Sequence, residues 1–322
     1  MQQYIIRRLL QMIPTLIGTT FIVFVIINMA PGSPLSHMVD PNISDEAIER
    51  RREQLGLDQP LIQRYGSWLT EAVQGNLGYS TRYRGRLVTE LVQSRLFPTI
   101  TLTFSSILVS FIIAIPIGII SATRQYSTID YSVVVSAIAG VSIPVFFLGI
   151  VLVWLFGFTL GWLPIGGMVS AGVRHPNFIS YAADVGRHLL LPLITLTAAN
   201  TARFVRFTRS SMLEVIKQDY VRTARAKGLS EQVVIYRHAL RNALLPVVTI
   251  LGLSLPFLFS GAIITESVFS WPGMGTMLIE SVSQRDYGLL MGINLFLAVL
   301  VILGNLLADI FYSVVDPRIR YD

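Results

Sequence analysis

The chain of 322 residues contains no cysteine and few charged residues. Without cysteine it has no disulfide, no thiolate metal ligand and no thiol nucleophile. Charged residues make up 14% of the sequence, whereas soluble proteins carry about 25%. A soluble protein must present a polar surface to water, so this deficit excludes an ordinary soluble domain. The 52% of hydrophobic residues excludes a disordered chain, and we expect a protein embedded in lipid.

Lysine is almost missing as well. Only Lys217 and Lys227 are lysines among the 25 basic residues, and the formal net charge is +6. In a soluble protein such an excess would favour nucleic-acid binding. In a membrane protein it indicates that basic residues are concentrated on the cytoplasmic side, and their positions decide between the two interpretations.

Long apolar stretches are abundant, and a helix of about 20 apolar residues spans a bilayer. We predict an all-α integral membrane protein with six transmembrane helices, at 9–29, 99–122, 133–156, 189–207, 247–265 and 289–311. The fourth is the weakest, since it holds Asn200 and Arg203. The first is interpreted as a retained helix, because its apolar run is longer than that of a signal peptide and Pro31 lies where cleavage would occur.

The basic residues favour one orientation. With the N-terminus inside, 14 of them fall on inner segments and three in the two short outer loops. Both termini are therefore predicted to be cytoplasmic. Residues 1–8 and the tail 312–322 then lie inside. The long loop 30–98, interpreted as a small folded cap, and a gate region at 266–288 lie outside.

The inner loop at 209–246 carries signals for two short helices. Ser211 and Glu214 have the spacing of a capping box, which predicts that the first helix begins there. This helix is expected to run to about Lys227 and to stop at Gly228, the residue best able to adopt the left-handed conformation.

Ser230 is then expected to cap a second helix, which ends before Pro246. On charge alone, this pair of helices would be interpreted as a juxtamembrane element that touches anionic membrane lipid. A DNA-reading helix–turn–helix is the other alternative. It is improbable between two membrane spans, so no nucleic-acid partner is expected.

Several motifs carry a resemblance that covers nearly the whole chain. They are DYVRTARAKGL at 219–229, HALRNALLP at 238–246, TESVFSWPGMG at 265–275, RDY at 285–287 and DPR at 316–318. The first resembles the cytoplasmic EAA-type loop of binding-protein-dependent ABC importer permeases. Together the motifs resemble the dipeptide/oligopeptide/nickel family, and within it the first of two permease subunits. Arg222 stands where the generic pattern has glutamate, which fits this branch.

The resemblance implies an ABC importer type I permease fold, with 209–246 as coupling helices seated in an ATPase groove. The residues expected to form this docking and coupling surface are Asp219, Tyr220, Arg222, Thr223, Ala224, Arg225, Ala226, Lys227 and Gly228. It also implies four kinds of partner. They are a homologous second permease, two ABC ATPase subunits that hold ATP and Mg, an extracytoplasmic solute-binding protein, and the lipid of a bacterial or archaeal cell membrane. The expected cargo is a di- or oligopeptide, with nickel chelates, glutathione or other small solutes as alternatives.

The sequence offers little enzymatic chemistry. Neither lysine follows the glycine that a Walker A loop requires, so ATP hydrolysis is expected in separate subunits and no cofactor in this chain. The four histidines lie on different predicted loops without HExxH spacing, so no metal site is expected. A Ser–His pair at membrane depth, which an intramembrane protease would need, is also not predicted.

Polar residues at membrane depth mark either a pathway or hydrogen bonds between helices. The pathway candidates are Asn200, Ser254, Ser260 and Asn294. Glu266 and Trp271 follow the fifth predicted span and are candidates for an outer gate, with interfacial anchoring as the alternative for Trp271. No Asp or Glu lies in the middle of a predicted span, where it could carry a proton. The sequence also lacks the paired, broken hydrophobic segments that are typical of an inverted repeat. Both observations weigh against the rival interpretation, a stand-alone secondary transporter.

Overall fold

The computed structural model of the chain describes residues 2–29, 56–83, 85–254, 256–260 and 262–315, together with Glu46, Glu49, Arg50 and Arg52. Over this part of the chain the regular elements are all helices, which confirms the predicted all-α class. One isolated β-bridge joins Tyr79 to Leu87. The helices are α1 (Gln2–Met29), α3 (Leu61–Val73), α4 (Val88–Thr123), α5 (Thr128–Ser142), α6 (Val145–Leu152), η2 (Val153–Thr159), α7 (Phe178–Ile216), α8 (Asp219–Ala226), α9 (Glu231–Val233), η3 (Val234–Ala239), α10 (Leu240–Leu253), α11 (Phe257–Ser260), α12 (Ile263–Val268), α13 (Met274–Ser283) and α14 (Tyr287–Val315).

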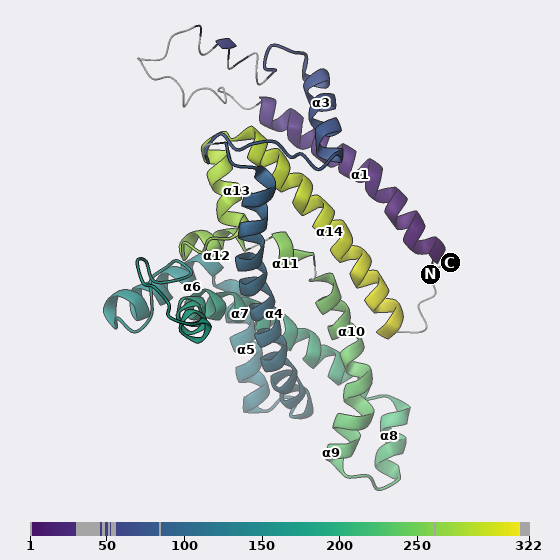
Figure 1. Cartoon of the computed structure of the whole chain (residues 1–322). Helices are drawn as coiled ribbons and strands as arrows, with labels where there is room; N and C mark the ends of the chain where they lie inside the picture. The colour runs from purple at the N-terminus through teal and green to yellow at the C-terminus, as the bar shows by residue number, and fades with distance from the viewer. Residues whose placement is uncertain are drawn as a thin grey trace.

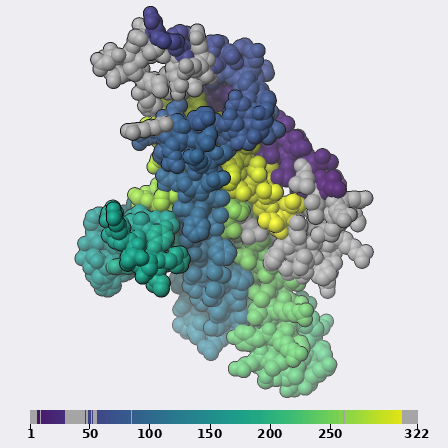
Figure 2. Space-filling view, in the orientation of Figure 1, coloured from purple at the N-terminus to yellow at the C-terminus, as the bar shows by residue number. Residues whose placement is uncertain are grey.

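The helices are arranged around the pair α4 and α7, which make the most extensive contact between any two elements. α1 lies along α14 on one side of this pair, and α3 packs on α1 (Figure 1). α8 and α9 project from one end of the molecule, while α12 and α13 lie toward the other end. In space-filling view, the α8–α9 region forms a separate projection, and the chain from α6 toward the start of α7 forms a lateral lobe (Figure 2).

Three helices are long and apolar enough to cross a membrane: Ile6–Met29, Val88–Thr123 and Tyr287–Ala308. Two bent pairs bring the number to five if each pair counts as one span. The part of the chain that the structure describes therefore contains three to five candidate spans. The predicted span 189–207 is not among these candidates, so the total of six spans and the sides assigned to the termini stay predictions.

The predicted span 133–156 is not one continuous helix. α5 ends at Ser142 and α6 begins at Val145, with a bend of 95° between the two segments of the pair. Pro144 explains the break, because the residue before a proline is driven out of the helical conformation. Ile143 accordingly has an extended backbone, with ψ of 121°.

The fifth predicted span, 247–265, is also divided. α10 ends at Leu253, and Phe257–Val268 continues after a bend of 46° next to Pro256. The prediction that the second inner helix ends before Pro246 is wrong. Pro246 lies inside a helix that runs from Glu231 to Leu253. A proline removes one hydrogen bond and bends a helix, but it need not end it.

The fourth predicted span, 189–207, lies within the 39-residue helix α7. The predicted capping box at Ser211 is wrong, because Ser211 is buried inside this helix and not at its start. The buried positions Phe204, Thr208 and Met212 continue at helical spacing past the serine. The core contact therefore carries the helix on to Ile216.

Candidate coupling site

α8 is a short helix set between α7 and the helix that begins at Glu231. Gln218 has an extended backbone at its start. At its end, Gly228 has a φ of +73°, and its N–H donates to the Arg225 carbonyl at 2.9 Å. This left-handed conformation costs other residues about 1–2 kcal/mol, so glycine permits the sharp turn into the next helix. The predicted stop at Gly228 is confirmed.

One face of α8 is buried against the chain's own helices. Val221 and Ala224 are its buried residues, and they belong to a single apolar cluster. The other buried members are Ile119 and Ala122 of α4, Met212 of α7, Val234 and Ala239 of η3, and Ala243 of α10. Ala224, which was predicted to lie on the docking surface, therefore faces the core. Its small side chain permits α8 to approach the neighbouring helices closely.

The opposite face of α8 is exposed. It carries Asp219, Tyr220, Arg222, Thr223, Ala226 and Lys227. Tyr220 is the large apolar side chain on this face, with 41% of its surface exposed. The ion pair between Arg222 and Asp219 is solvent-exposed at 3.4 Å and contributes little to stability. These six predicted docking residues lie where a partner can reach them.

Arg225, also predicted to belong to the docking and coupling surface, pairs with the next helix of its own chain. Its Nη2 and Nε donate to the two carboxylate oxygens of Glu231, at 2.7 and 3.2 Å. This carboxylate raises the pKa of Arg225 above its usual value, because it stabilises the charged guanidinium. A bidentate pair fixes orientation as well as distance. Arg225 therefore sets the angle between α8 and α9.

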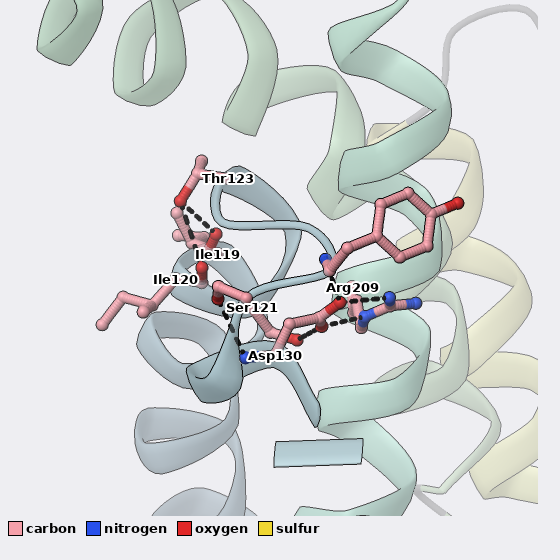
Figure 3. Close-up of polar contacts among 8 residues, drawn as sticks. Ile119, Ile120, Ser121, Thr123, Asp130 and Arg209 are labelled. Atoms are coloured by element: carbon pink, nitrogen blue, oxygen red, sulfur yellow. Dashed lines mark hydrogen bonds and ion pairs between the residues drawn. The ribbon is translucent and has the colours of Figure 1, made fainter. Parts of the chain in front are cut away.

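A second, buried ion pair lies beside this element and was missed in the sequence. Arg209 of α7 donates from Nε and Nη2 to the two carboxylate oxygens of Asp130 of α5, at 2.7 and 2.8 Å (Figure 3). Asp130 is 2% exposed. A local signal for this aspartate exists in the sequence, since Ser127-x-x-Asp130 before an apolar run is a capping box. The N–H of Asp130 does donate to the Ser127 hydroxyl, at 3.3 Å.

α4 and α7 approach each other closely next to this ion pair. A Cβ added to Gly118 of α4 would lie 2.6 Å from the Cβ of Thr208, the residue before Arg209. Real side chains do not pack at this separation, so only glycine permits the crossing. The ends of α4 and α7 that hold α8 are therefore locked together.

Away from α8, Glu266 lies on α12 and is completely buried. Its carboxylate accepts hydrogen bonds from the Thr99 hydroxyl at 2.9 Å and from the backbone N–H groups of Gly275 at 2.7 Å and Thr276 at 3.1 Å. The last two belong to the first turn of α13, where helices leave N–H groups unpaired. Glu266 thus joins α4, α12 and α13, and it does not reach the surface in this conformation.

Trp271 belongs to the same buried node. It is completely buried, and its indole N–H donates to the Pro98 carbonyl of α4 at 2.9 Å. Interfacial anchoring is therefore not its role in this structure, because an interfacial tryptophan lies at the lipid–water boundary. Glu266 and Trp271 support the region that was predicted as an outer gate, but neither side chain is open to cargo here.

A further junction was missed in the sequence. Asp286, completely buried, accepts from the Leu289 N–H at 3.1 Å and so caps the start of α14. Its other oxygen accepts from the Ser80 hydroxyl at 2.5 Å and from the Arg82 N–H at 3.0 Å. The aspartate before the apolar run at 289–311 was the available signal for this cap. Its partners, more than 200 positions away, had none.

Two of the predicted pathway residues form hydrogen bonds within their own helices. Ser254 donates to the Ile250 carbonyl, and Asn294 to the Leu290 carbonyl, each at 2.8 Å within its own helix. Asn200 is half-buried on α7. The side chain of Ser260 lies outside the described residues. Whether any of these residues contacts cargo stays a prediction.

Comparison with known proteins gives two family matches. Residues 1–103 match the N-terminal family of the membrane components of binding-protein-dependent transport systems. Residues 114–321 match the family described as "Binding-protein-dependent transport system inner membrane component". Together the two matches cover almost the entire chain.

Curated relatives match over their full length. The oligopeptide transport system permease protein AppB of Bacillus subtilis is 44% identical over 321 residues, covering 100% of both chains. The glutathione transport system permease protein GsiC of Escherichia coli is 41% identical over 321 residues, with the same coverage. A solved inward-facing structure of the MetNI methionine ABC transporter aligns with a TM-score of 0.55 at 19% identity. It covers 71% of this chain and 97% of that chain, and this likeness shows the fold alone.

Proposed function

Because the chain belongs to the family of binding-protein-dependent transport system inner membrane components, we propose that it forms half of the pathway of an ATP-driven peptide importer. The other half is a homologous second permease. Two ABC ATPase subunits supply the energy, and an extracytoplasmic solute-binding protein delivers the cargo. Six spans, with both termini in the cytoplasm of a bacterial or archaeal cell, complete the proposed topology.

The observation that carries this proposal is that α8 is buried on one face and exposed on the other. Its exposed face, with Tyr220, is available to an ATPase subunit. Its buried face is packed against α4, α7 and α10. A ligand or partner can shift a conformational equilibrium only through contacts that differ between the two states. α8 can form such contacts with an ATPase subunit through its exposed face, and its packed face can pass a movement on to α4, α7 and α10.

The relatives favour a peptide as cargo. The name of AppB specifies oligopeptides and that of GsiC specifies glutathione, itself a small peptide. We therefore propose a di- or oligopeptide cargo, with glutathione as the first alternative and nickel chelates or other small solutes after it. Selection of the cargo is assigned to the binding protein.

The decisive experiment uses the complex of both permeases, the ATPases and the binding protein in proteoliposomes. Uptake of a labelled peptide should require ATP and stop with vanadate. Uptake that persists without ATP would instead support a secondary transporter. Competition with glutathione and with a nickel chelate distinguishes the cargo alternatives.

Docking of α8 is tested in the same complex, because the chain has no cysteine of its own. A cysteine at the exposed Ala226 should crosslink to an ATPase subunit through a short bifunctional reagent. A cysteine at Thr159, exposed at the end of η2, is the matched control and should not. Equal crosslinking from both positions would contradict the docking assignment.

A further inference from the structure

α5 has its one fully buried residue in its first turn, and the half-buried Val133 packs nearby against the core of α4, α7 and α10. Of its 15 residues, Asp130 is the one that is buried. Along the remainder, Val135, Ile138 and Val141 are 57–63% exposed. The opposite end of α5 leads into the 95° bend before α6. A helix with one buried residue close to one end can change its angle with little loss of packed core.

The carboxylate of Asp130 is fully hydrogen-bonded. One carboxylate oxygen of Asp130 accepts from Arg209 Nε and from the Ser121 hydroxyl, at 2.7 and 2.5 Å. The other accepts from Arg209 Nη2 and from the Tyr126 N–H, at 2.8 and 3.0 Å (Figure 3). Two parallel bonds between planar groups resist sliding of α5 along α7. They do not reach the distant end of α5, which meets α7 through small residues.

Both partners of Asp130 adjoin the residues that hold the coupling helix. Ser121 lies between Ile119 and Ala122, which pack in the cluster that buries one face of α8. Arg209 lies less than one helical turn before Met212, which packs in the same cluster. The ends of α4 and α7 and the helix α8 thus form one block, and Asp130 joins α5 to it.

A groove of about 450 Å³ lies between α5 and α7, and Arg209 is at its edge. Val133 and Ala137 of α5 form one wall, and Ala202 and Val205 of α7 form the other. Farther along α5, Gly140 faces Ala202: a Cβ added there would lie 3.2 Å from the alanine Cβ. Such small residues touch without interlocking, so the two helices can separate at this end.

We propose that the Asp130–Arg209 pair is the joint through which α8 moves α5, so that α5 turns about it and changes the width of the α5–α7 groove. The proposal rests on the proposed function, because it requires an ATPase that acts on α8. Asp130 and Arg209 are positioning residues, since they act through α5. Their contribution is to the coupling between ATP hydrolysis and uptake.

The first test replaces Arg209 by lysine in the full complex. Lysine keeps the charge but cannot make two parallel bonds, so α5 is held at one point. ATP hydrolysis stimulated by the binding protein should persist, while uptake per ATP hydrolysed should fall by about tenfold, within the usual range of coupling between sites. Arg203→Lys, on the exposed side of the same helix, is the matched control and should retain the wild-type ratio. A wild-type ratio in Arg209→Lys would overturn the proposal.

The second test keeps the ion pair intact and locks the other end of α5. The separation at Gly140 and Ala202 is close to that of a disulfide, so Gly140→Cys with Ala202→Cys should crosslink on oxidation. The oxidised protein should lose uptake, and a reductant should restore it. Normal uptake in the oxidised form would show that α5 does not turn.

The second test also decides the matter if Arg209→Lys fails to assemble. Absence of ATP-dependent uptake in the wild-type complex is a different result. It would overturn the proposed function and not the joint alone.

Discussion

The carboxylate of Glu266 occupies the place that a side chain on Gly273 would fill. A Cβ added to Gly273 would overlap this carboxylate, and one added to Gly275 would lie 2.8 Å from its Oε2. The Trp-Pro-Gly turn and the glutamate are therefore one interlocked unit. The glycines leave room for a buried carboxyl group that accepts hydrogen bonds at the start of α13.

Gly273→Ala should destabilise the protein, because the added methyl group must displace the Glu266 carboxylate. Overpacking of this kind costs about 1–3 kcal/mol. Thermal unfolding of the purified protein in detergent should show a lower midpoint. Gly186→Ala is the control: it places a methyl group in open space on α7 and should leave the midpoint unchanged or slightly higher.

Thr99→Val should also lower stability, although it preserves the shape of the side chain. The Thr99 hydroxyl donates to Glu266 and accepts from the Met274 N–H at 2.7 Å. Valine leaves both buried groups without this partner, at a cost of about 1–3 kcal/mol each. Thr101→Val removes an exposed hydroxyl that bonds only within its own helix, and unfolding should be close to wild type. Equal effects from the two substitutions would contradict the assigned node.

Gly228→Val is expected to separate ATP hydrolysis from uptake, or to prevent assembly with the ATPases, while membrane insertion survives. The space around Gly228 is open, so the effect arises from the left-handed backbone and not from a clash. Strain of about 1–2 kcal/mol should change the angle at which α8 leaves the turn. Hydrolysis and uptake are measured in parallel in proteoliposomes. Wild-type transport in this variant would refute the role of the turn.

Ser80→Ala should loosen the segment before α4. The Ser80 hydroxyl joins Asp286 to the Tyr83 N–H, which donates to it at 3.0 Å. Without it, the loop keeps the hydrogen bond from the Arg82 N–H to Asp286 but loses the one from residue 80, and limited proteolysis should cut this loop more rapidly. Ser283→Ala, at an exposed hydroxyl, serves as the control and should be cut at the wild-type rate.

Acid should release the segment that precedes α7. The backbone N–H and the hydroxyl of Ser170 donate to Asp184, at 2.7 and 2.9 Å, and they lower the pKa of this carboxyl below its usual value. A lowered pKa means that the contact stabilises the fold above the ordinary aspartate pKa and is lost as the pH falls through the folded value. Proteolysis near Ser170 with an acid protease should therefore accelerate at low pH in the wild type. In Asp184→Asn the rate should show no such acid-dependent rise.

The sequence was informative where the signal is local. Gly228 marked the turn after α8, and the apolar stretches marked α1, α4 and α14. Pro144 and Pro256 are sequence signals for the two bends, because a proline disfavours the helical conformation of the residue before it. The length of an apolar stretch predicts a span but does not show whether the helix is continuous. The motif from Thr265 to Gly275 indicated the family, but the sequence did not show that Glu266 and Trp271 are buried.

The remaining parts depend on contacts between distant residues. Asp130 and Arg209 are 79 positions apart, and the local capping signal at Asp130 does not reveal its pairing with Arg209. By its sequence context, Arg209 is one of several basic residues of the inner loop. Likewise, nothing near Ala224 reveals whether it faces a partner or its own core. These assignments follow from packing, which a single sequence does not specify.

The helix from Glu231 to Leu253 runs without interruption past Pro246. At 1.5 Å per residue this rod is about 34 Å long, so a tilt of roughly 5° at one tip carries the other tip about 3 Å sideways. Amplification of this kind needs no flexible joint along the rod. The nearest point at which the backbone can take up this displacement is the bend beside Pro256, where α10 has ended and α11 begins.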